Sequence, residues 1–440
     1  MGGTTTDIAL VNNGVPVKAV GGVQVGKWKT FVSGLYIKTF GLGGDSAVHC
    51  SGGNICLEDY RVTPLCVAAE TYPYIADNIN NLLEKSVKHI KYLHEHIILV
   101  KDIADNPRYT DDEKRLCAAL NAGPLPLREA AECVPGKDIY THNFTRLINE
   151  GVIQIIGFTP TDVMHIKGDF VKYPIEASVL GARYVAMNAG ITVDELCRRV
   201  YNEVKRKLYV NIVKVLLENN DDYYMNNGVG KDVERLIDES YRIAERAVGA
   251  AGTAGVSVTG KLAGAMEVSG AAGSAGSTGD SGAAGSAGET FVAAGFTTDY
   301  VLTGVGAPIH IFLRDVAARL GTTAVIPEHY EVANALGAIV GSVSASGIVD
   351  IRPNYSAAGI TGYTVSGAEE TKEFNTIREA EEFAAAEASE IARAEAVRRG
   401  ARGEINIDCS LKTDEADAGQ YRIFLGTRAV AQAVGAVGFK

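Results

Sequence analysis

The stretch from residue 249 to residue 288 limits the possible folds of this chain more than any other feature. It consists mainly of Gly, Ala and Ser, and the heptapeptide GAAGSAG occurs at 270–276 and again at 282–288. These side chains bury almost no apolar surface, so we expect a flexible coil between folded parts. With 440 residues, and roughly 100–200 residues in an ordinary domain, two or three domains are expected.

The composition restricts the class of partner. It is 46% hydrophobic and 22% charged, as in soluble globular proteins. The net charge of −11 argues against nucleic acid, which requires clustered Lys and Arg. The seven cysteines are scattered without a CxxC pair or a secretory leader, which favours a reducing cytoplasm. No apolar stretch approaches the roughly 20 residues of a membrane span, so no membrane partner is expected.

The chain before the Gly-rich segment begins with short strands. Ile8 to Val11 is an apolar run, Asn13-Gly14 is a hairpin signal, and Phe31 to Thr39 alternates apolar and polar residues. We therefore expect residues 1–66 to be rich in β-structure.

Helical periodicity dominates residues 74–248. From Tyr74 to Val100, apolar side chains recur at three- and four-residue spacing, which predicts one long helix. Further helices are expected at 175–188, 193–219 and 233–247.

Residues 110–165 have a winged-helix-like order of elements. We expect a helix at 110–121, a second after Pro126, a third at 144–150 and a strand pair across 152–159. A DNA-binding function would need a basic face, but the second and third helices carry Glu129, Glu132, Asp138 and Glu150 against only Arg128, Lys137 and Arg146. We interpret the segment as a structural insertion.

After the Gly-rich segment the pattern returns to α/β. We expect a helix at 309–320, a strand at 323–326 and a helix at 330–340. The tail predicts one helix at 377–399 and strands at 404–407 and 421–425.

The opening residues carry the first candidate for chemistry. Gly2 and Gly3 precede three hydroxyl side chains, Thr4, Thr5 and Thr6, and the carboxylate of Asp7, directly before a strand. Glycines let backbone N–H groups approach a phosphate, threonine hydroxyls donate to its oxygens, and Asp7 is placed to hold Mg²⁺ or orient water. The alternative is an ordinary Gly turn between strands.

Four segments together resemble a known family. GGTTTDIALVNNG resembles the second phosphate loop of the hydantoinase A and 5-oxoprolinase family, whose members have the actin-like ATPase superfold. GLGGDS at 41–46, GFTPTDVMHIKG at 157–168 and the long segment from Thr303 to Gly341 resemble that family's later motifs, in family order.

The resemblance implies an α/β fold of the actin-like, ribonuclease-H-like type, in which two domains with mixed sheets close over ATP and Mg²⁺. Gly2, Gly3, Thr4, Thr5 and Thr6 would then cradle phosphate, and Asp7 and Asp45 are the candidate catalytic carboxylates. The nucleotide turn would comprise Gly304, Gly306, Ala307 and Pro308. Asn334 would stabilise that turn, or alternatively serve as a buried packing amide.

We therefore expect the chain to consist of five parts. These are a β-rich phosphate-loop part at 1–73, a helical insertion at 74–248 with its winged-helix-like segment, a low-complexity segment at 249–290, a nucleotide-side α/β part at 291–365 and an α+β subdomain at 366–440.

The sequence also departs from the family pattern. Family members have an Asp before Met-Gly-Gly, where this chain has Met1 first, and they carry an earlier domain with a first phosphate loop. The chain is thus expected to be the carboxy-terminal portion of a longer protein, or a short homologue that works with a second subunit or has lost ATPase activity.

Asp162 and His165 are a candidate metal pair. They stand three apart in TPTDVMH, so a helical turn puts them on one face. His49, Cys50 and His142 are the plausible further ligands of an additional divalent metal. The alternative is that Thr159 or Thr161 caps a helix with Asp162 in its first turn. For Asp45, a turn-stabilising role is the alternative to a general base.

Three functions follow as expectations. The first is ATP-dependent hydrolysis of a small cyclic amide, of the hydantoin or 5-oxoproline type. The second is a subunit of an acetone- or acetophenone-carboxylase-like complex. The third is a catalytically inactive nucleotide- or partner-binding domain.

Overall fold

The computed structural model describes residues 1–12, 14–19, 22, 24–25, 28–30, 34–51, 53–251, 295–357, 359–367, 370–418 and 421–437. It contains both helices and strands throughout, which confirms the mixed α/β class. Most of the low-complexity segment predicted at 249–290, together with Asn13 and residues 31–33, lies outside the described residues. Two compact units are present, one of Met1–Val11 with Pro16–Glu331 and one of Asn12–Val15 with Val332–Lys440.

The strands up to Glu331 are β1 Thr6–Ala9, β2 Val11–Asn12, β3 Val15–Pro16, β4 Lys18–Ala19, β5 Gln24–Val25, β6 Trp28–Lys29, β7 Gly34–Leu35, β8 Ile37–Phe40, β9 Ser46–Ser51, β10 Asn54–Arg61, β11 Thr63–Pro64, β12 His96–Leu99, β13 Leu125–Pro126, β14 Ile153–Gly157, β15 Leu302–Thr303 and β16 Ala324–Val325. The helices in this region are α1 Leu65–Thr71, α2 Tyr74–Glu84, α3 Asp111–Leu120, α4 Leu127–Glu132, α5 Thr145–Asn149, α6 Pro160–Lys167, α7 Glu176–Ala189, α8 Val193–Asn220, α9 Asp222–Asn227, α10 Lys231–Ala251 and α11 Ile309–Arg319, followed by the 3-10 turn η2 Tyr330–Val332.

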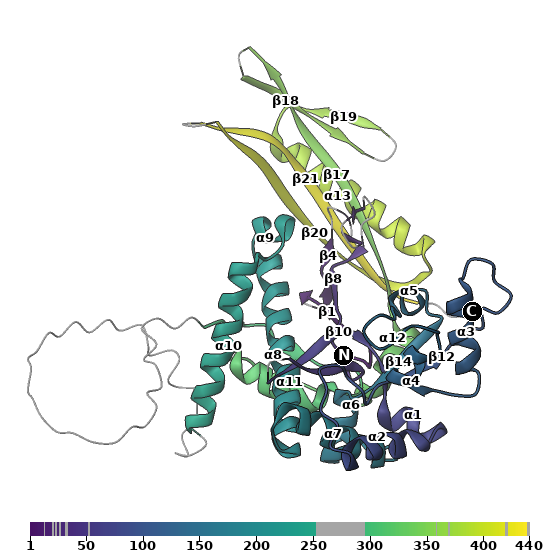
Figure 1. The fold of residues 1–440 in the computed structure, drawn as a ribbon. Coiled ribbons are helices and arrows are strands. Elements are labelled where there is room, and N and C mark those ends of the chain that lie inside the picture. Colours follow the sequence, from purple (N-terminus) through teal and green to yellow (C-terminus); the bar gives the residue numbers. More distant parts are fainter. Residues whose placement is uncertain are drawn as a thin grey trace, which may run out of the picture. The chain divides into compact units, whose positions relative to one another are not determined.

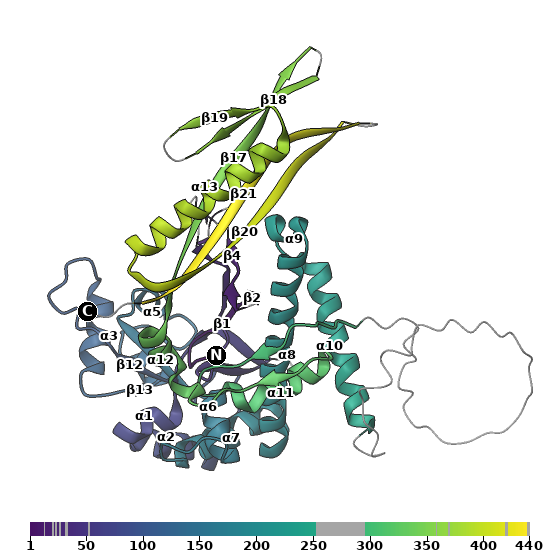
Figure 2. The same cartoon turned by 180° about the vertical axis from the view of Figure 1, so that it is seen from behind.

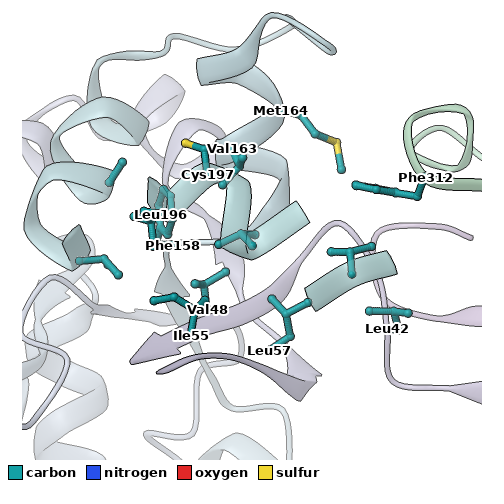
Figure 3. Packing of buried hydrophobic residues seen from close by; sticks show 14 of the residues in the cluster. Leu42, Val48, Ile55, Leu57, Phe158, Val163, Met164, Leu196, Cys197 and Phe312 are labelled. Atoms are coloured by element: carbon teal, nitrogen blue, oxygen red, sulfur yellow. The ribbon is translucent and has the colours of Figure 1, made fainter. Parts of the chain in front are cut away.

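The main core of the first unit lies between the β9–β10 hairpin and the helices α6, α7, α8 and α11. Figure 3 shows Val48, Ile55 and Leu57 of the hairpin pointing toward Phe158, which is 1% exposed. Lys207 of α8 donates to the carbonyl oxygen of Leu57 at 2.6 Å. The hairpin is thereby fixed against the helices, and its first residue, Ser46, adjoins the Gly41–Asp45 turn.

A second sheet in this unit corrects two sequence predictions. Its order is β11-β14-β12-β13, with β14 parallel to β11 and antiparallel to β12. The predicted helix at 74–100 is wrong beyond Glu84: the chain turns at Ser86, whose φ is 50°, and His96–Leu99 form β12. The predicted strand pair at 152–159 is a single strand, because β14 takes its partners from distant parts of the chain.

The winged-helix-like segment has its own small core. Leu116, Cys117 and Leu120 of α3 pack there with Leu147 of α5 and Ile153 of β14. Thr110 caps α3, accepting from the Glu113 N–H while the Glu113 carboxylate accepts from the Thr110 N–H, a complete capping box. The three predicted helices of this segment are confirmed in order.

The second unit contains α12 Ala333–Val340, β17 Ser342–Ser356, β18 Gly359–Ser366, β19 Thr371–Phe374, α13 Ile377–Arg398, β20 Ala401–Ala418 and β21 Tyr421–Val437. Its strands form one antiparallel sheet in the order β19-β18-β17-β21-β20. This sheet crosses residues 365–366 without a break, so the domain boundary predicted there is wrong. The physical reason is that β18 pairs through main-chain hydrogen bonds with β17 on one side and with β19 on the other.

Helix α13 lies along this sheet in both views (Figures 1 and 2). A stripe of alanines four residues apart is fully buried against the strands: Ala380, Ala384, Ala388, Ala392 and Ala396. At Gly347 of β17 a Cβ atom would overlap the carbonyl oxygen of Ala388. Small side chains on both elements therefore permit this close contact.

None of the helices in the described part of the chain is both long enough and apolar enough to cross a membrane.

Candidate functional site

The opening loop is held against the Gly41–Asp45 turn by main-chain hydrogen bonds. The Gly44 N–H donates to the Gly2 oxygen at 3.1 Å, and the Asp45 N–H donates to the Gly3 oxygen at 2.7 Å. Within the loop, the Gly2 N–H donates to the Thr5 oxygen at 2.9 Å. Two motifs some forty residues apart in sequence thus form one compact double turn.

Glycine is required where the two turns meet. A Cβ atom at Gly43 would overlap the Gly3 carbonyl, and one at Gly3 would lie 2.5 Å from Oδ2 of Asp45. Gly2 has space, since its nearest neighbour would be 3.8 Å away. The backbone of Gly3 and Thr4 is exposed, and their N–H groups have no acceptor within the described residues. These two N–H groups are available to an anion.

Helix α6 begins at this double turn. The N–H and the hydroxyl of Thr161 both donate to the Gly44 oxygen at 2.8 Å, and the hydroxyl also reaches Oδ1 of Asp45 at 3.3 Å. The GLGGDS and TPTD segments are therefore in direct contact.

Asp45 and Arg61 supply the charges of the site. Burial raises the pKa of Asp45, while the Arg61 guanidinium and the Thr161 hydroxyl act in the opposite direction. Arg61 lies 4.0 Å from Oδ2 of Asp45 and donates to the Thr4 hydroxyl at 3.2 Å. Because the Arg61 side chain is 51% exposed, it can also reach a bound anion.

The Gly304–Pro308 turn also meets the opening loop. A Cβ atom at Gly306, whose φ is 99°, would overlap the carbonyl oxygen of Met1. Gly304 is buried against Ile309 and Leu313 of α11, and its N–H donates to the Val325 oxygen at 2.9 Å. Ala307 and Pro308 lead directly into α11, with Pro308 at its N-cap.

A cavity of about 250 Å³ runs beside this turn. Its walls are mostly apolar and come from β1, α8, α11 and residues 300–305, with Leu10, Leu208, Ile212 and Leu302 among them. Asp7 lines it as well, and its Oδ1 accepts from the Thr39 hydroxyl at 2.6 Å. Met1 and Gly304 line it too, so this mostly apolar cavity reaches the Gly304 turn.

Asp162 is fully buried and saturated by protein donors. It accepts from the N–H groups of Leu65, Cys66 and Thr159 and from the hydroxyls of Thr159 and Ser178, at 2.6–3.2 Å. Thr159 is the N-cap of α6 and forms a capping box with Asp162. These contacts support the capping alternative for Asp162.

His165 is also occupied within the protein. Its Nδ1 donates to the Thr161 oxygen at 2.8 Å, and its Nε2 accepts from the N–H groups of Lys172 and Tyr173 at 3.2 Å. His49 lies between Glu58 and Glu95 instead. Within the residues that the structure describes, no three His, Cys, Asp or Glu side chains gather as a metal site. The Asp162–His165 metal pair, with Cys50 or His142 as a further ligand, gains no support from this geometry.

Three other predicted residues lie apart from the double turn. Thr6 is buried and its hydroxyl donates to the Leu42 oxygen at 2.7 Å, which does not fit a phosphate contact. Asp7 is exposed on β1. Asn334 is exposed in α12 of the second unit, so it is not a buried packing amide; its role at the Gly304 turn stays a prediction.

The sequence did not identify Arg61 as a site residue, and it did not predict the hydrogen bond between Thr161 and Gly44. Arg61 ends a strand and carries no motif, so only its position opposite Thr4 identifies it. Thr161 belongs to the quoted TPTD segment, but its partner Gly44 is remote in sequence.

Comparison with known proteins gives no match: no family description, curated protein or solved structure is significantly similar to this chain.

Proposed function

We propose that this chain binds ATP and forms part of an ATP-dependent hydrolase that opens a small cyclic amide, of the hydantoin or 5-oxoproline type. The proposal includes an actin-like ATPase architecture, with the opening loop as the second phosphate loop and the first one supplied by an amino-terminal domain or another subunit. One observation carries it: the opening loop, the Gly41–Asp45 turn, Thr161 and the Gly304–Gly306 turn converge on one place in the first unit.

Different groups at that place would bind the phosphates, the nucleoside and the magnesium ion of Mg·ATP. The free N–H groups of Gly3 and Thr4 face the phosphates, and the exposed Arg61 adds a positive charge. The apolar cavity beside Gly304 accepts the nucleoside. Mg²⁺ keeps several water ligands and needs only one or two carboxylates besides the phosphates, so Asp45, or Asp7 at the cavity edge, fits this ion without a cluster of protein ligands. When bound, the ion neutralises phosphate charge.

Phosphorylation solves the chemical problem of an unreactive amide. Nitrogen donation makes the ring carbonyl a poor electrophile. Transfer of the γ-phosphoryl group to the carbonyl oxygen breaks the bond between that phosphorus and the bridging oxygen of ADP and forms a new O–P bond. Water then adds to the carbon, the ring C–N bond breaks as nitrogen gains a proton, and an acyl phosphate is left.

A second water molecule completes the reaction. It attacks the acyl carbon, and phosphate leaves with the oxygen that was originally the ring carbonyl. The products are an open-chain carboxylate and amine, ADP and phosphate. Asp45 is the candidate base for the attacking water: burial raises its pKa, which brings the carboxylate closer to the range needed for proton transfer.

The first test is titration calorimetry of Mg·ATP into the purified chain. We expect saturable binding that is lost in Gly3→Val, which blocks the backbone approach, and weakened in Arg61→Ala. Arg378→Ala removes an exposed arginine of α13, whose Nε lies 3.0 Å from Oε1 of Glu382, and is the matched control. Absence of binding by the chain, both alone and with a candidate amino-terminal domain, would reject the proposal.

The reaction itself is tested with a substrate labelled with ¹⁸O at the ring carbonyl, in the presence of that domain or subunit. The proposed route delivers the label to inorganic phosphate. Label that remains entirely in the carboxylate would exclude phosphorylation of the amide oxygen.

No observation favours the carboxylase-like alternative, since Asp162 and His165 are engaged in protein hydrogen bonds.

A further inference from the structure

A second cavity lies away from the glycine turns, between β9, the segment that follows α2 and helix α7. It has a volume of about 170 Å³. At about 30 Å³ for each water-sized group, it has room for about five or six such groups, the size of a five-membered ring with one small substituent. Five of the residues that line it carry the polar or aromatic groups used in the following argument: Cys50, Tyr92, His94, Tyr184 and Asn188.

His94 is the unusual member of this group. Its side chain is 1% exposed, and neither ring nitrogen has a hydrogen-bond partner within the described residues. The Tyr184 hydroxyl is also buried without a hydrogen bond of normal geometry, and the two rings are 5.3 Å apart. A buried polar group left without a partner costs about 1–3 kcal/mol. The protein keeps two such groups at one cavity.

The framework around the cavity is well fixed. The side-chain amide of Asn188 donates to the main-chain carbonyl oxygen of Tyr184 at 2.9 Å, and its Oδ1 accepts from the His89 N–H at 3.1 Å. The second bond joins the segment after α2 to α7. Tyr92 stacks on His49 with ring centroids 3.5 Å apart and planes 9° from parallel. Fixed rings are suited to a planar ligand.

The charges around the cavity indicate an uncharged ligand. Burial, together with the neighbouring His49 and His96, lowers the pKa of His94 to about 3, so its ring is neutral at pH 7. Among the described residues that line the cavity there is no Asp or Glu. Lys91 also lines it, but this residue is exposed and its Nζ lies over the Tyr140 ring, 6.0 Å from the centroid. A neutral imidazole offers one N–H donor and one acceptor nitrogen.

We propose that this cavity is a second ligand site, which binds a small, planar, uncharged heterocycle through hydrogen bonds of its N–H or C=O groups with His94. A five-membered cyclic amide has this size, shape and polarity. The site is independent of the ATP chemistry proposed above, and its test uses no nucleotide.

The test measures protection of Cys50, which lines the cavity and is partly exposed. The purified chain is alkylated with iodoacetamide with and without hydantoin or 2-pyrrolidone, and the rate at each cysteine is followed by peptide mass spectrometry. We expect either ring, at about ten times its Kd, to slow alkylation of Cys50 about tenfold. Cys133 lies in the separate winged-helix-like core and is equally partly exposed; its rate should not change.

Variants locate the contact. His94→Phe keeps an aromatic ring but removes both nitrogens, and it is expected to weaken binding about tenfold, equivalent to one hydrogen bond between uncharged groups. Since the change removes unpaired buried nitrogens, the fold should tolerate it. Tyr184→Phe gives a second, milder test of the same site.

The proposal is overturned if His94→Phe is protected as well as the natural protein. It is equally overturned if neither ring protects Cys50 at tens of millimolar, because the cavity then holds only water.

Discussion

Asp162 offers the sharpest test, because the capping role and the metal role make opposite predictions. In Asp162→Ala, three buried backbone N–H groups, those of Leu65, Cys66 and Thr159, lose their acceptor. At about 1–3 kcal/mol for each unmet donor, and with partial relief from entering water, we expect a loss of roughly 3–6 kcal/mol in the free energy of unfolding. Asp162→Asn keeps one acceptor oxygen and should lose roughly half as much.

The measurement is thermal unfolding followed by circular dichroism. For a unit of this size, a loss of 1 kcal/mol lowers Tm by about 2–4 °C, so Asp162→Ala should melt about 6–24 °C below the natural protein. Asp194→Ala is the matched control: it removes an exposed carboxylate from the first turn of α8. Its expected cost is at most about 1 kcal/mol, from the helix dipole alone.

The same experiment is repeated with EDTA and with added Mn²⁺ or Zn²⁺. The capping role predicts the same Tm in all three conditions, since the five donors to Asp162 come from the protein itself. A metal-dependent rise of several degrees that disappears in Asp162→Asn would refute the reasoning. So would a Tm of Asp162→Ala equal to that of the control.

Three further predictions concern other parts of the chain. Gly43→Ala should lower the free energy of unfolding in urea by roughly 1–3 kcal/mol or more, because its Cβ overlaps the Gly3 carbonyl, whereas Gly2→Ala has space and should be near neutral; equal effects would contradict the close approach. Burial raises the pKa of Asp45, so the stability that this shift contributes is present below the ordinary pKa near 3.8 and is lost as pH rises through the folded value. Asp45→Asn should thus stabilise the protein at pH 7 and not at pH 3, and urea titrations that show the reverse order would disprove this. Ala388→Leu should cost about 1–3 kcal/mol by overpacking the α13 interface, in contrast to the exposed Ala386→Leu; similar midpoints for both would contradict the fully buried alanine stripe.

Sequence reasoning succeeded where short-range forces decide the structure. The helix predicted at 193–219 is α8 Val193–Asn220, and the tail helix predicted at 377–399 is α13 Ile377–Arg398. Thr159 caps α6, one of the two caps that the sequence offered. In each case, apolar periodicity and a neighbouring cap residue are enough to predict the helix, because helical and capping hydrogen bonds join residues three or four positions apart.

The same reasoning failed at 85–100. The apolar spacing there is compatible with a helix, but the chain leaves the helical path at Ser86, and His96–Leu99 pair with β13 and β14. A strand with two remote partners gains more from that pairing than from local propensity, and no window of sequence contains those partners.

By itself, the sequence therefore determined the mixed α/β class, most helices and the residues able to form glycine turns. Only the tertiary structure decided that Gly3 meets Asp45, that Arg61 faces Thr4, and that Asp162 is closed off by donors from three elements. Apart from that of Thr159, these contacts join residues 16 to 97 positions apart. Their formation depends on how whole elements pack, since packing sets both the distance between remote groups and their separation from water.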